Sequence, residues 1–324
     1  MTNVVAISRA KNEADIIEAW VRHTVTHVDR VIVSENDSTD DTAAILQALV
    51  DEGLPITVLK ESTIGDYQAS IFTRMMREVA PAADWIVPLD TDEFIETTPD
   101  QNASPLPERD EGGKPTTWPR LADLLAQGPT TVRALPWQSM AWSSANGCAR
   151  DINPVVYVRD RLIEETFYQK VCVPSAVAMS KTLCTGSHFM LPDGDRGTLV
   201  PHARLCHFPL RSVDQYKLKA CIAYLQSACV PGWDRKTGFQ FGAIPDIDKI
   251  DEEALAQYSR RYASHNPPEW QPRTIDQPLD YRGGPLRYTK PVDRFIPTLL
   301  RYAETLALGI ASRDTAGQSF AVNR

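Results

Sequence analysis

Short apolar runs alternate with segments of helical periodicity over the first 95 residues of the chain. Apolar runs at 4–7, 31–33, 56–59 and 85–89 predict four strands. Between them, apolar residues recur every three or four positions, which predicts three helices. Because strands and helices alternate at intervals of about 25 to 30 residues, we expect an α/β fold with a mostly parallel, covered sheet. Proline cannot donate to a strand ladder, so we expect Pro88 to lie where the fourth strand ends.

The chain divides into four parts by this pattern and by composition. The regular part covers residues 1–96, and a proline-rich, charged stretch at 97–130 predicts an inserted loop. A second, less regular half covers residues 131–230. Residues 231–324 form a mostly irregular C-terminal extension.

Weaker signals place further elements in the last two parts. Apolar runs at 155–158 and 170–173 predict strands, and a helix is predicted at about 213–230. An amphipathic helix is predicted from about 298 to 310 near the C-terminus. Its apolar residues could serve a dimer or a peripheral membrane contact as readily as the core, and the sequence leaves the oligomeric state open.

Composition narrows the classes of function. With 43% hydrophobic and 23% charged residues, the chain is neither fibrous nor wholly disordered. Its 42 acidic and 34 basic side chains give a net charge of −8, so we expect no nucleic-acid partner, and any phosphate must be held by a local cluster or a metal.

Targeting signals and cysteine spacing indicate the compartment. No apolar run approaches the roughly 18 residues of a spanning helix, and the first residues lack a signal-peptide pattern. The six cysteines contain no CxxC pair, which favours reduced, mostly buried thiols over disulfides or a zinc ribbon. We therefore expect a cytoplasmic protein without a transmembrane segment.

Three carboxylates within four positions, Asp90, Asp92 and Glu93, follow the fourth predicted strand. Residues i and i+2 of an extended chain project to the same side, so Asp90 and Asp92 could converge on one cation. Hard oxygen donors suit Mg²⁺ or Mn²⁺ better than zinc. A solvated acidic turn is the alternative, but the carboxyl end of a parallel strand is where open α/β sheets bind ligands.

The motifs around these carboxylates resemble those of family 2 glycosyltransferases, in the subgroup that carries a DxDEF signature. The resemblance begins with the segments 10–17 and 36–42 and includes Asp84 to Phe94, reading DWIVPLDTDEF. The later segments that match are 137–147, 170–174, 186–189 and 205–212. Together they span about residues 3 to 219, and their order makes the combination specific although each motif alone is weak.

The resemblance implies a GT-A fold and a metal-dependent enzyme. Such an enzyme moves a sugar from a nucleoside-diphosphate sugar to an acceptor hydroxyl, with inversion, and uses Mn²⁺ or Mg²⁺. Residues 1–96 would then be the nucleotide-sugar-binding half and 131–230 the acceptor and catalytic half. The expected metal ligands are Asp90, Asp92 and His207. The residues expected to contact the nucleotide sugar are Ser8, Arg9, Glu13, Glu35, Asn36, Arg74, Thr91, Lys170, His188 and Arg211.

Several of these residues have a plainer interpretation. The segment from Glu35 to Asp40 could merely cap the following helix, Arg74 could point into water, and His188 could be a turn residue. His207 and Arg211 flank Pro209, so they cannot form an i,i+4 pair within one helix and belong to a strand end or loop. There a histidine can ligate a cation, and an arginine can present its donors to phosphate.

The general base that inversion requires stays open among several carboxylates, with Glu93, Asp193 and Asp195 as the main candidates. Glu93 adjoins the metal motif, but its side chain should point away from that of Asp92. Asp193 and Asp195 follow His188 and could reach an acceptor, and Glu164 and Glu165 occupy a similar region.

Two other functions compete with glycosyl transfer. A nucleotidyltransferase acting on sugar phosphates would usually show a glycine-rich loop after the first strand, and residues 8–12 contain no glycine. A non-catalytic nucleotide- or sugar-binding protein would not need the acidic motif together with the basic residues that follow it. The donor sugar, the nucleotide and the acceptor are not determined by the sequence.

Overall fold

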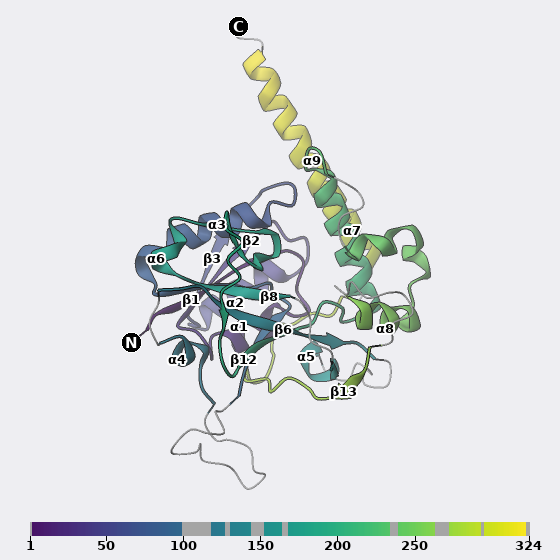
Figure 1. Cartoon of the computed structure of the whole chain (residues 1–324). Helices are drawn as coiled ribbons and strands as arrows, with labels where there is room; N and C mark the ends of the chain where they lie inside the picture. Colours follow the sequence, from purple (N-terminus) through teal and green to yellow (C-terminus); the bar gives the residue numbers. More distant parts are fainter. Residues whose placement is uncertain are drawn as a thin grey trace, which may run out of the picture.

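The computed structural model describes residues 2–98, 118–126, 130–143, 152–163, 168–233, 239–262, 272–292 and 295–321 (Figure 1). The side chains of 239–243 and 313–321 are outside this description. Most of the inserted loop predicted at 97–130 falls outside the described residues, as do Glu164 and Glu165.

The first part of the chain forms four parallel strands in the order β3-β2-β1-β4. They are β1 (Val4–Ala10), β2 (Arg30–Glu35), β3 (Ile56–Lys60) and β4 (Trp85–Pro88). The helices between them are α1 (Ile17–Thr24), α2 (Thr42–Asp51) and α3 (Gln68–Val79), and the 3₁₀ turn η1 (Ala80–Ala82) follows α3. The predicted α/β class is confirmed, and Pro88 is the last residue of its strand.

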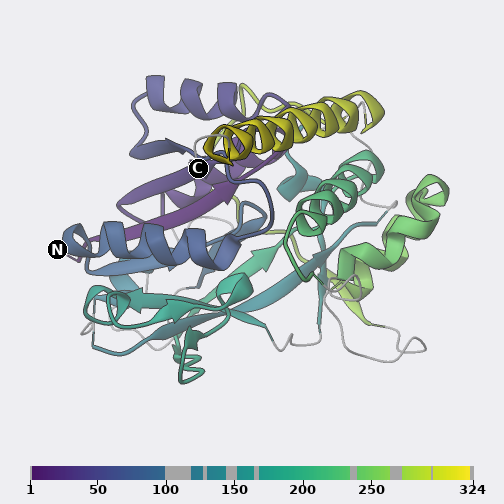
Figure 2. The ribbon, with the colours of Figure 1, turned by 90° about the horizontal axis from the view of Figure 1, so that it is seen from above.

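Helices cover both faces of this sheet, as Figure 2 shows. The reason is visible in β1, whose successive side chains point to opposite faces. Val4 and Ala6 belong to the core that contains Trp20 of α1, whereas Val5 and Ile7 belong to the core that contains Phe72 of α3. A strand buried on both faces reads as a continuous apolar run, which is why it could be recognised from the sequence.

The second half extends the same sheet beyond β4 with mainly antiparallel pairs. The order continues β4-β8-β6-β7-β13, while β12 pairs with both β6 and β5. The strands are β5 (Glu93–Thr97), β6 (Arg133–Ala141), β7 (Asp160–Leu162), β8 (Gln169–Pro174), β11 (Thr198–Leu199), β12 (Ala203–His207) and β13 (Thr274–Asp276), with a separate pair β9 (Thr182–Leu183) and β10 (Met190–Leu191).

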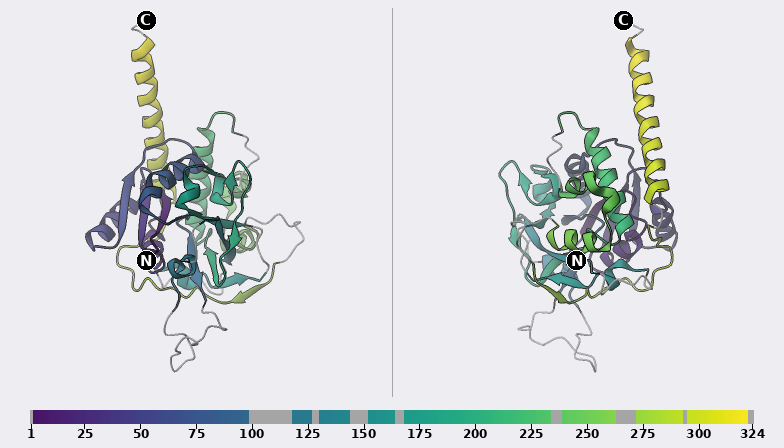
Figure 3. Two further views of the ribbon diagram at one scale, coloured as in Figure 1. Left: turned by 60° about the vertical axis from the view of Figure 1, so that its left-hand side comes forward. Right: turned by 90° about the vertical axis from the view of Figure 1, so that its right-hand side faces the viewer.

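The remaining helices follow β5 in the chain, and the first of them lies in the part predicted as an inserted loop. They are α4 (Leu121–Leu125), α5 (Pro154–Tyr157), α6 (Ser175–Ala178), α7 (Val213–Ala228), α8 (Glu252–Arg261) and α9 (Phe295–Ala321), with 3₁₀ segments η2 (Thr185–Ser187) and η3 (Phe239–Lys249). Helix α9 packs along α7 and extends beyond the rest of the chain (Figure 3).

One predicted strand, at 155–158, is wrong. Residues Pro154–Tyr157 form the short helix α5 instead. Proline at the first helical position is already set to a helical φ, and the Asn153 side chain accepts a hydrogen bond from the Val155 N–H. These local signals outweigh the strand preference of two adjacent valines. The C-terminal helix is also longer than predicted, starting at Phe295 and ending at Ala321.

The described residues bear on the expected absence of a membrane span and on the expected state of the cysteines. None of the described helices is long and apolar enough to span a membrane. The five cysteines within the described part of the chain are free, and Cys172, Cys184 and Cys206 are buried.

The C-terminal extension is tied to α1 by the buried side chain of Glu18. Its carboxylate accepts hydrogen bonds from the backbone N–H groups of Arg287, Tyr288 and Thr289 at 2.7 to 2.8 Å, and from the Thr289 hydroxyl at 2.8 Å. It also pairs with Arg22 one turn along α1, at 2.9 Å. Burial alone would raise the pKa of Glu18, but the donors of Tyr288 and Arg287 outweigh it and lower that pKa.

We expect Glu18→Gln to lower the free energy of unfolding by about 2–3 kcal/mol at pH 7, because a neutral amide turns its N–H₂ toward donors that need an acceptor. A carboxylate with a lowered pKa stabilises the fold above its unfolded pKa of about 4.3, and this contribution is lost as pH falls through the folded pKa. The difference between variant and wild type should therefore shrink below about pH 4. Urea unfolding at several pH values measures this difference in the free energy of unfolding, with the exposed Glu78→Gln as control. Equal loss in both variants would contradict the anchoring role.

Candidate functional site

A cavity of about 450 Å³ lies where the carboxyl ends of β1 and β4 meet β12 and α7. Seven residues predicted as site residues line it, namely Arg9, Glu13, Asp90, Thr91, Asp92, His188 and His207. Lys170 lies directly behind it, bonded to Asp90. The cavity is therefore at the sheet edge where α/β proteins bind their ligands.

The two aspartates of the acidic motif are each paired with a lysine from the second half. Asp90 accepts hydrogen bonds from Lys170 Nζ at 2.7 Å and from Gln68 Nε2 at 2.6 Å. Asp92 pairs with Lys219 Nζ and lies 3.6 Å from His207 Nε2. Burial alone would raise the pKa of Asp92, but Lys219 and His207 hold that pKa well below its ordinary value. Asp92 is thus a buried, fully ionised carboxylate.

Strand register brings Asp92 to His207 although they are far apart in the sequence. Strand β5 pairs antiparallel with β12 so that Glu93 is opposite His207. The backbone N–H of Phe208 also donates to the Asp92 carbonyl at 2.8 Å. Because this ladder continues on the other side of β12 into β6, the position of His207 is set by strands on both sides.

Glu93 is fully buried and does not line the cavity. Its Oε2 accepts a hydrogen bond from the Asp90 N–H at 2.9 Å and lies 3.2 Å from Lys170 Nζ. Burial raises the pKa of Glu93 well above its ordinary value despite the nearby lysine. These contacts suit a residue that holds the acidic loop in place.

Asp193 and Asp195 are outside the lining of the cavity as well. Both pair with Lys181, at 2.7 and 3.0 Å. The carboxylates that do line the cavity are Glu13, Asp66, Asp90 and Asp92. The geometry therefore brings none of the three predicted base candidates to the described cavity wall.

At the end of β1, two cations extend along the cavity. Arg9 donates to the Asn36 side-chain oxygen at 2.7 Å and lies 3.7 Å from Asp66. Lys11 donates to the backbone carbonyls of Asn36 and Asp37. Burial, and then the Arg9 charge, lowers the pKa of Lys11 to about 8.

Ser8 and Glu35 belong to the same edge of the sheet but lie outside the lining of the cavity. Ser8 is fully buried in β1. The Glu35 carboxylate accepts the Ser38 N–H at 2.7 Å, and Asp40 in the same loop accepts the N–H groups of Thr42 and Ala14. Glu35 therefore holds the loop after β2, and Asp40 holds the start of α2 and the turn after β1, while the N-cap residue of α2, Asp41, makes no side-chain cap hydrogen bond.

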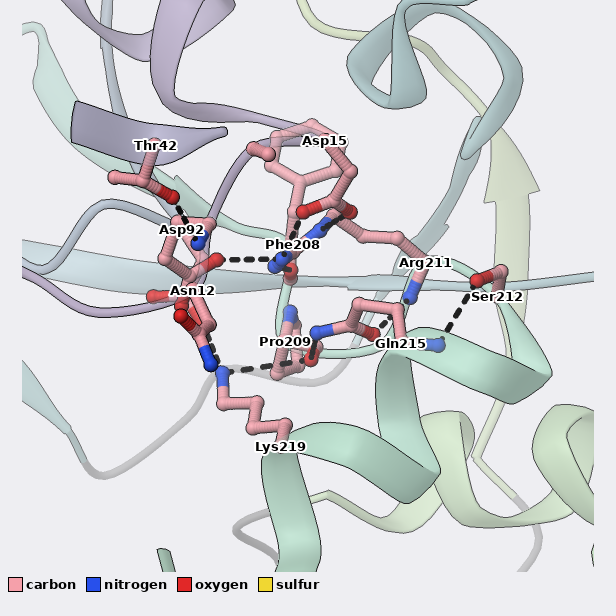
Figure 4. A network of polar contacts seen from close by, with 12 residues as sticks. Asn12, Asp15, Thr42, Asp92, Phe208, Pro209, Arg211, Ser212, Gln215 and Lys219 are labelled. Carbon is pink, nitrogen blue, oxygen red and sulfur yellow. Dashed lines mark hydrogen bonds and ion pairs between the residues drawn. The ribbon is translucent and has the colours of Figure 1, made fainter. Parts of the chain in front are cut away.

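Arg211 pairs with two carboxylates, of which Asp15 is labelled in Figure 4, and does not line the cavity. Its guanidinium donates to both Asp15 oxygens at 2.7 and 2.9 Å and to Glu13 Oε2 at 2.6 Å, and its side chain is 1% exposed. With Nε and Nη2 directed at these acids and Nη1 at the Phe208 carbonyl, Arg211 is placed to position Glu13 at the cavity. Arg74 lies outside the cavity as well, with 56% of its side chain exposed and paired with Glu61.

An aromatic wall forms part of the lining of the cavity. It consists of five rings that all line the cavity, Trp137, Tyr168, His188, His207 and Tyr262. Trp137 stacks on His207 with ring centroids 4.3 Å apart and meets His188 edge-on at 5.1 Å. Tyr262, from the end of α8, packs edge-on against His207 at 5.6 Å.

His188 has a defined protonation state in this wall. Its Nδ1 lies 2.8 Å from the Gln169 carbonyl, so Nδ1 carries the proton and Nε2 is an acceptor. Burial, and then the charge of Lys170, lowers the pKa of His188 to about 4. His188 is therefore neutral at pH 7 and able to accept a hydrogen bond from a hydroxyl.

Several lining residues were not identified from the sequence, notably Lys11, Gln68, Lys219 and Tyr262. A signal for Lys219 exists in retrospect. Residues 215, 219, 222 and 226 of α7 are spaced by four, three and four positions and all line the cavity. Three of them are polar, so one stripe of this helix is polar where a covered helix would be apolar. Tyr262 has no such signal, because it lies in the irregular extension.

The residues present can be tested for their fit to a divalent cation. Within the described chain, no three His, Cys, Asp or Glu groups are close enough together to hold a metal. Asp92 and His207, however, supply an oxygen and an imidazole nitrogen 3.6 Å apart at an open cavity. Mn²⁺ accepts both ligand types and commonly completes its shell with water and phosphate oxygens. The pair fits such an ion if the substrate contributes the remaining ligands.

Comparison with known proteins adds neighbours of low similarity. No protein-family model and no curated protein matches the chain. The chain is similar to glucosyl-3-phosphoglycerate synthase from Mycobacterium tuberculosis in complex with Mn²⁺, UDP and glucosyl-3-phosphoglycerate, with 22% identity and a TM-score of 0.23. The match covers 29% of this chain and about a third (34%) of that chain.

Two further solved structures match over more of the chain. Mannosyltransferase PcManGT from Pyrobaculum calidifontis, in complex with GDP-Man and Mn²⁺, has 14% identity over 99% of this chain and 80% of that one, with a TM-score of 0.38. TarS 1–349 from S. aureus has 9% identity over 81% and 70% of the two chains, also with a TM-score of 0.38. All three TM-scores are below 0.5, so these likenesses carry no argument about the function of this chain.

Proposed function

We propose that this chain is a glycosyltransferase that moves a sugar from a nucleoside-diphosphate sugar to an acceptor hydroxyl. The observation that carries the proposal is the meeting of three features in one cavity. These are the acidic motif after β4, a set of lysines and arginine around it, and an aromatic wall that adjoins it through His207. The cations would hold the diphosphate of the donor together with a metal ion at the acidic motif, and the aromatic wall would hold the sugar.

The diphosphate would lie against the cations. Arg9, Lys11 and Lys219 line the cavity, and Lys170 is bonded to Asp90 just behind it. Fixed cations in a partly enclosed site stabilise the charge that develops on a departing diphosphate. Mn²⁺ or Mg²⁺, held by Asp92 and His207 with Asp90 nearby, would supply the same charge neutralisation at the phosphate oxygens.

The sugar would lie against the aromatic wall. Aromatic faces pack against the apolar C–H faces of pyranose rings, and polar tips at the edge can fix hydroxyl groups. His188 Nε2 offers an acceptor in this wall, since the proton is on Nδ1.

Inversion would need one base opposite the leaving diphosphate. Glu13 and Asp66 line the cavity and pair with arginines, Arg211 and Arg9, whereas Asp90 and Asp92 pair with lysines. Burial raises the pKa of Glu13 to about 7 against the opposing charge of Arg211. These two carboxylates join Glu93, Asp193 and Asp195 as candidates for the base.

Titration calorimetry with UDP and GDP, with and without Mn²⁺, tests the proposal. We expect one of the two nucleotides to bind, and Lys219→Met to weaken that binding about 10- to 150-fold, as loss of a charge-assisted contact worth about 1.5–3 kcal/mol would do. Lys217→Met, on the same helix but outside the cavity, is the matched control. When the protein is then incubated with a panel of nucleotide sugars, the donor that it uses should release the nucleoside diphosphate that binds in calorimetry. A wild-type protein that binds neither nucleotide would contradict the proposal.

A further inference from the structure

Gln68 bridges the acidic motif and the His188 loop, which comprises residues 184–189. It is the first residue of α3, is half-buried and lines the cavity. Its side-chain Nε2 donates to Asp90 Oδ1 at 2.6 Å, and its Oε1 accepts the backbone N–H of Gly186 at 3.3 Å. One amide side chain therefore connects a carboxylate of the first half of the chain to a loop of the second half.

A second link between Asp90 and the His188 loop runs through β8. Lys170 Nζ donates to Asp90 Oδ2 at 2.7 Å. The carbonyl of Gln169, the preceding residue, lies 2.8 Å from His188 Nδ1. Each oxygen of Asp90 is thus bonded to a side chain that leads to the loop. Moving the loop away from Asp90 would break bonds in both links.

The His188 loop has a backbone conformation that needs such support. Gly186 and Ser187 have φ values of 77° and 54°, and this left-handed region costs a residue with a side chain about 1–2 kcal/mol. A Cβ atom added at Gly186 would lie 2.5 Å from His188 Nε2. The His188 ring therefore packs directly on the residue whose N–H Gln68 holds.

We propose that Gln68 is a positioning residue that sets the distance between the acidic motif and His188. This rests on the proposed function, in which the diphosphate lies at the acidic motif and the sugar lies against the aromatic wall that contains His188. Sugar and diphosphate belong to one donor molecule, so both parts of the cavity must keep one spacing for the bond between them to break. A misplacement of about 1 Å can lower a rate about 100-fold. Gln68 acts on the sugar through His188.

Hydrogen exchange in the free protein tests whether Gln68 holds the loop. Gln68→Met keeps the approximate length of the side chain and removes both hydrogen bonds. We expect the backbone amides of residues 186–189 to exchange at least about 10-fold faster than in the wild type, because the loop opens more often. Gln47→Met is the matched control, since Gln47 also donates to an aspartate, Asp51 at 2.8 Å, but is exposed on α2. Unchanged exchange in Gln68→Met would overturn the proposal, whatever the protein binds.

Calorimetry and turnover then separate positioning from a general loss of structure. With Mn²⁺, we expect Gln68→Met to bind UDP or GDP, whichever the wild type binds, within about threefold of the wild-type affinity, because the cations at the acidic motif remain. The kcat for the nucleotide sugar that the panel identifies as donor should fall at least about 10-fold, because the sugar is misplaced. Equal losses of nucleotide affinity and kcat would contradict the positioning role.

A double-mutant cycle tests whether Gln68 acts through His188. In a His188→Ala background, Gln68→Met should lower kcat by less than about threefold, because the residue that Gln68 positions is already absent. The same loss in both backgrounds would overturn the proposal. A wild-type protein that binds neither nucleotide and releases no diphosphate would overturn the proposed function, and with it the role of Gln68 in transfer, even if the exchange result holds.

Discussion

Replacing Arg211 with methionine is expected to lower the free energy of unfolding by about 3–5 kcal/mol, the usual cost of leaving a buried charge without its partner. Burial alone would lower the pKa of Arg211, but Asp15 and Glu13 raise it, so the guanidinium is charged throughout the accessible pH range. Without it, two acids at the start of α1 lose the cation that links them to the β12–α7 connection. The variant should unfold at a lower urea concentration.

Arg159→Met is the matched control for this experiment. Arg159 also makes a two-pronged pair, with Asp276, but both side chains are exposed. Exposed pairs contribute little because water already solvates them, so the control should lose far less stability. The comparison also separates two roles for Arg211. If Arg211→Met keeps wild-type stability and loses only nucleotide affinity, Arg211 contacts phosphate, as the family resemblance implies.

Replacing Asp92 with asparagine is expected to reduce sugar transfer about 100-fold or more, equivalent to a loss of several kcal/mol in transition-state stabilisation. Asp92 is the carboxylate at which His207 from β12 and Lys219 from α7 meet. A neutral amide there would weaken the cation site and leave Lys219 without its counter-charge. The variant should also need more Mn²⁺ to reach its own maximal rate.

Steady-state assays of nucleotide release at several Mn²⁺ concentrations measure this effect, with the exposed Asp51→Asn as control. Because the pKa of Asp92 is held well below its ordinary value, its carboxylate stays ionised above about pH 4. Its titration should therefore be absent from the rate profile between pH 5 and 9. If the asparagine variant turns over as fast as the wild type at equal Mn²⁺, Asp92 has no role in the transfer reaction.

Strands β1, β2 and β4 could be predicted because each is buried along nearly its whole length, which shows in the sequence as an apolar run. Val4 to Ile7 form a continuous apolar run, since β1 is covered on both faces, and the three helices show apolar stripes. The run at 155–158 has similar composition, yet Asn153 and Pro154 turn it into a helix. Short apolar segments carry too little periodicity to separate strand from helix, and the capping residues decided the outcome here.

For the candidate site, too, some features follow from local sequence and others only from the tertiary structure. The sequence by itself determined that Asp90 and Asp92 follow a buried strand and that His207 is not within a helix, because both facts depend on neighbouring residues. Only the tertiary structure decided that β5 pairs with β12, that Lys219 reaches Asp92, and that Tyr262 lines the cavity. The β5–β12 pairing and the Lys219–Asp92 pair join residues more than 100 positions apart, and they are selected by the packing of the whole sheet, for which no local pattern exists.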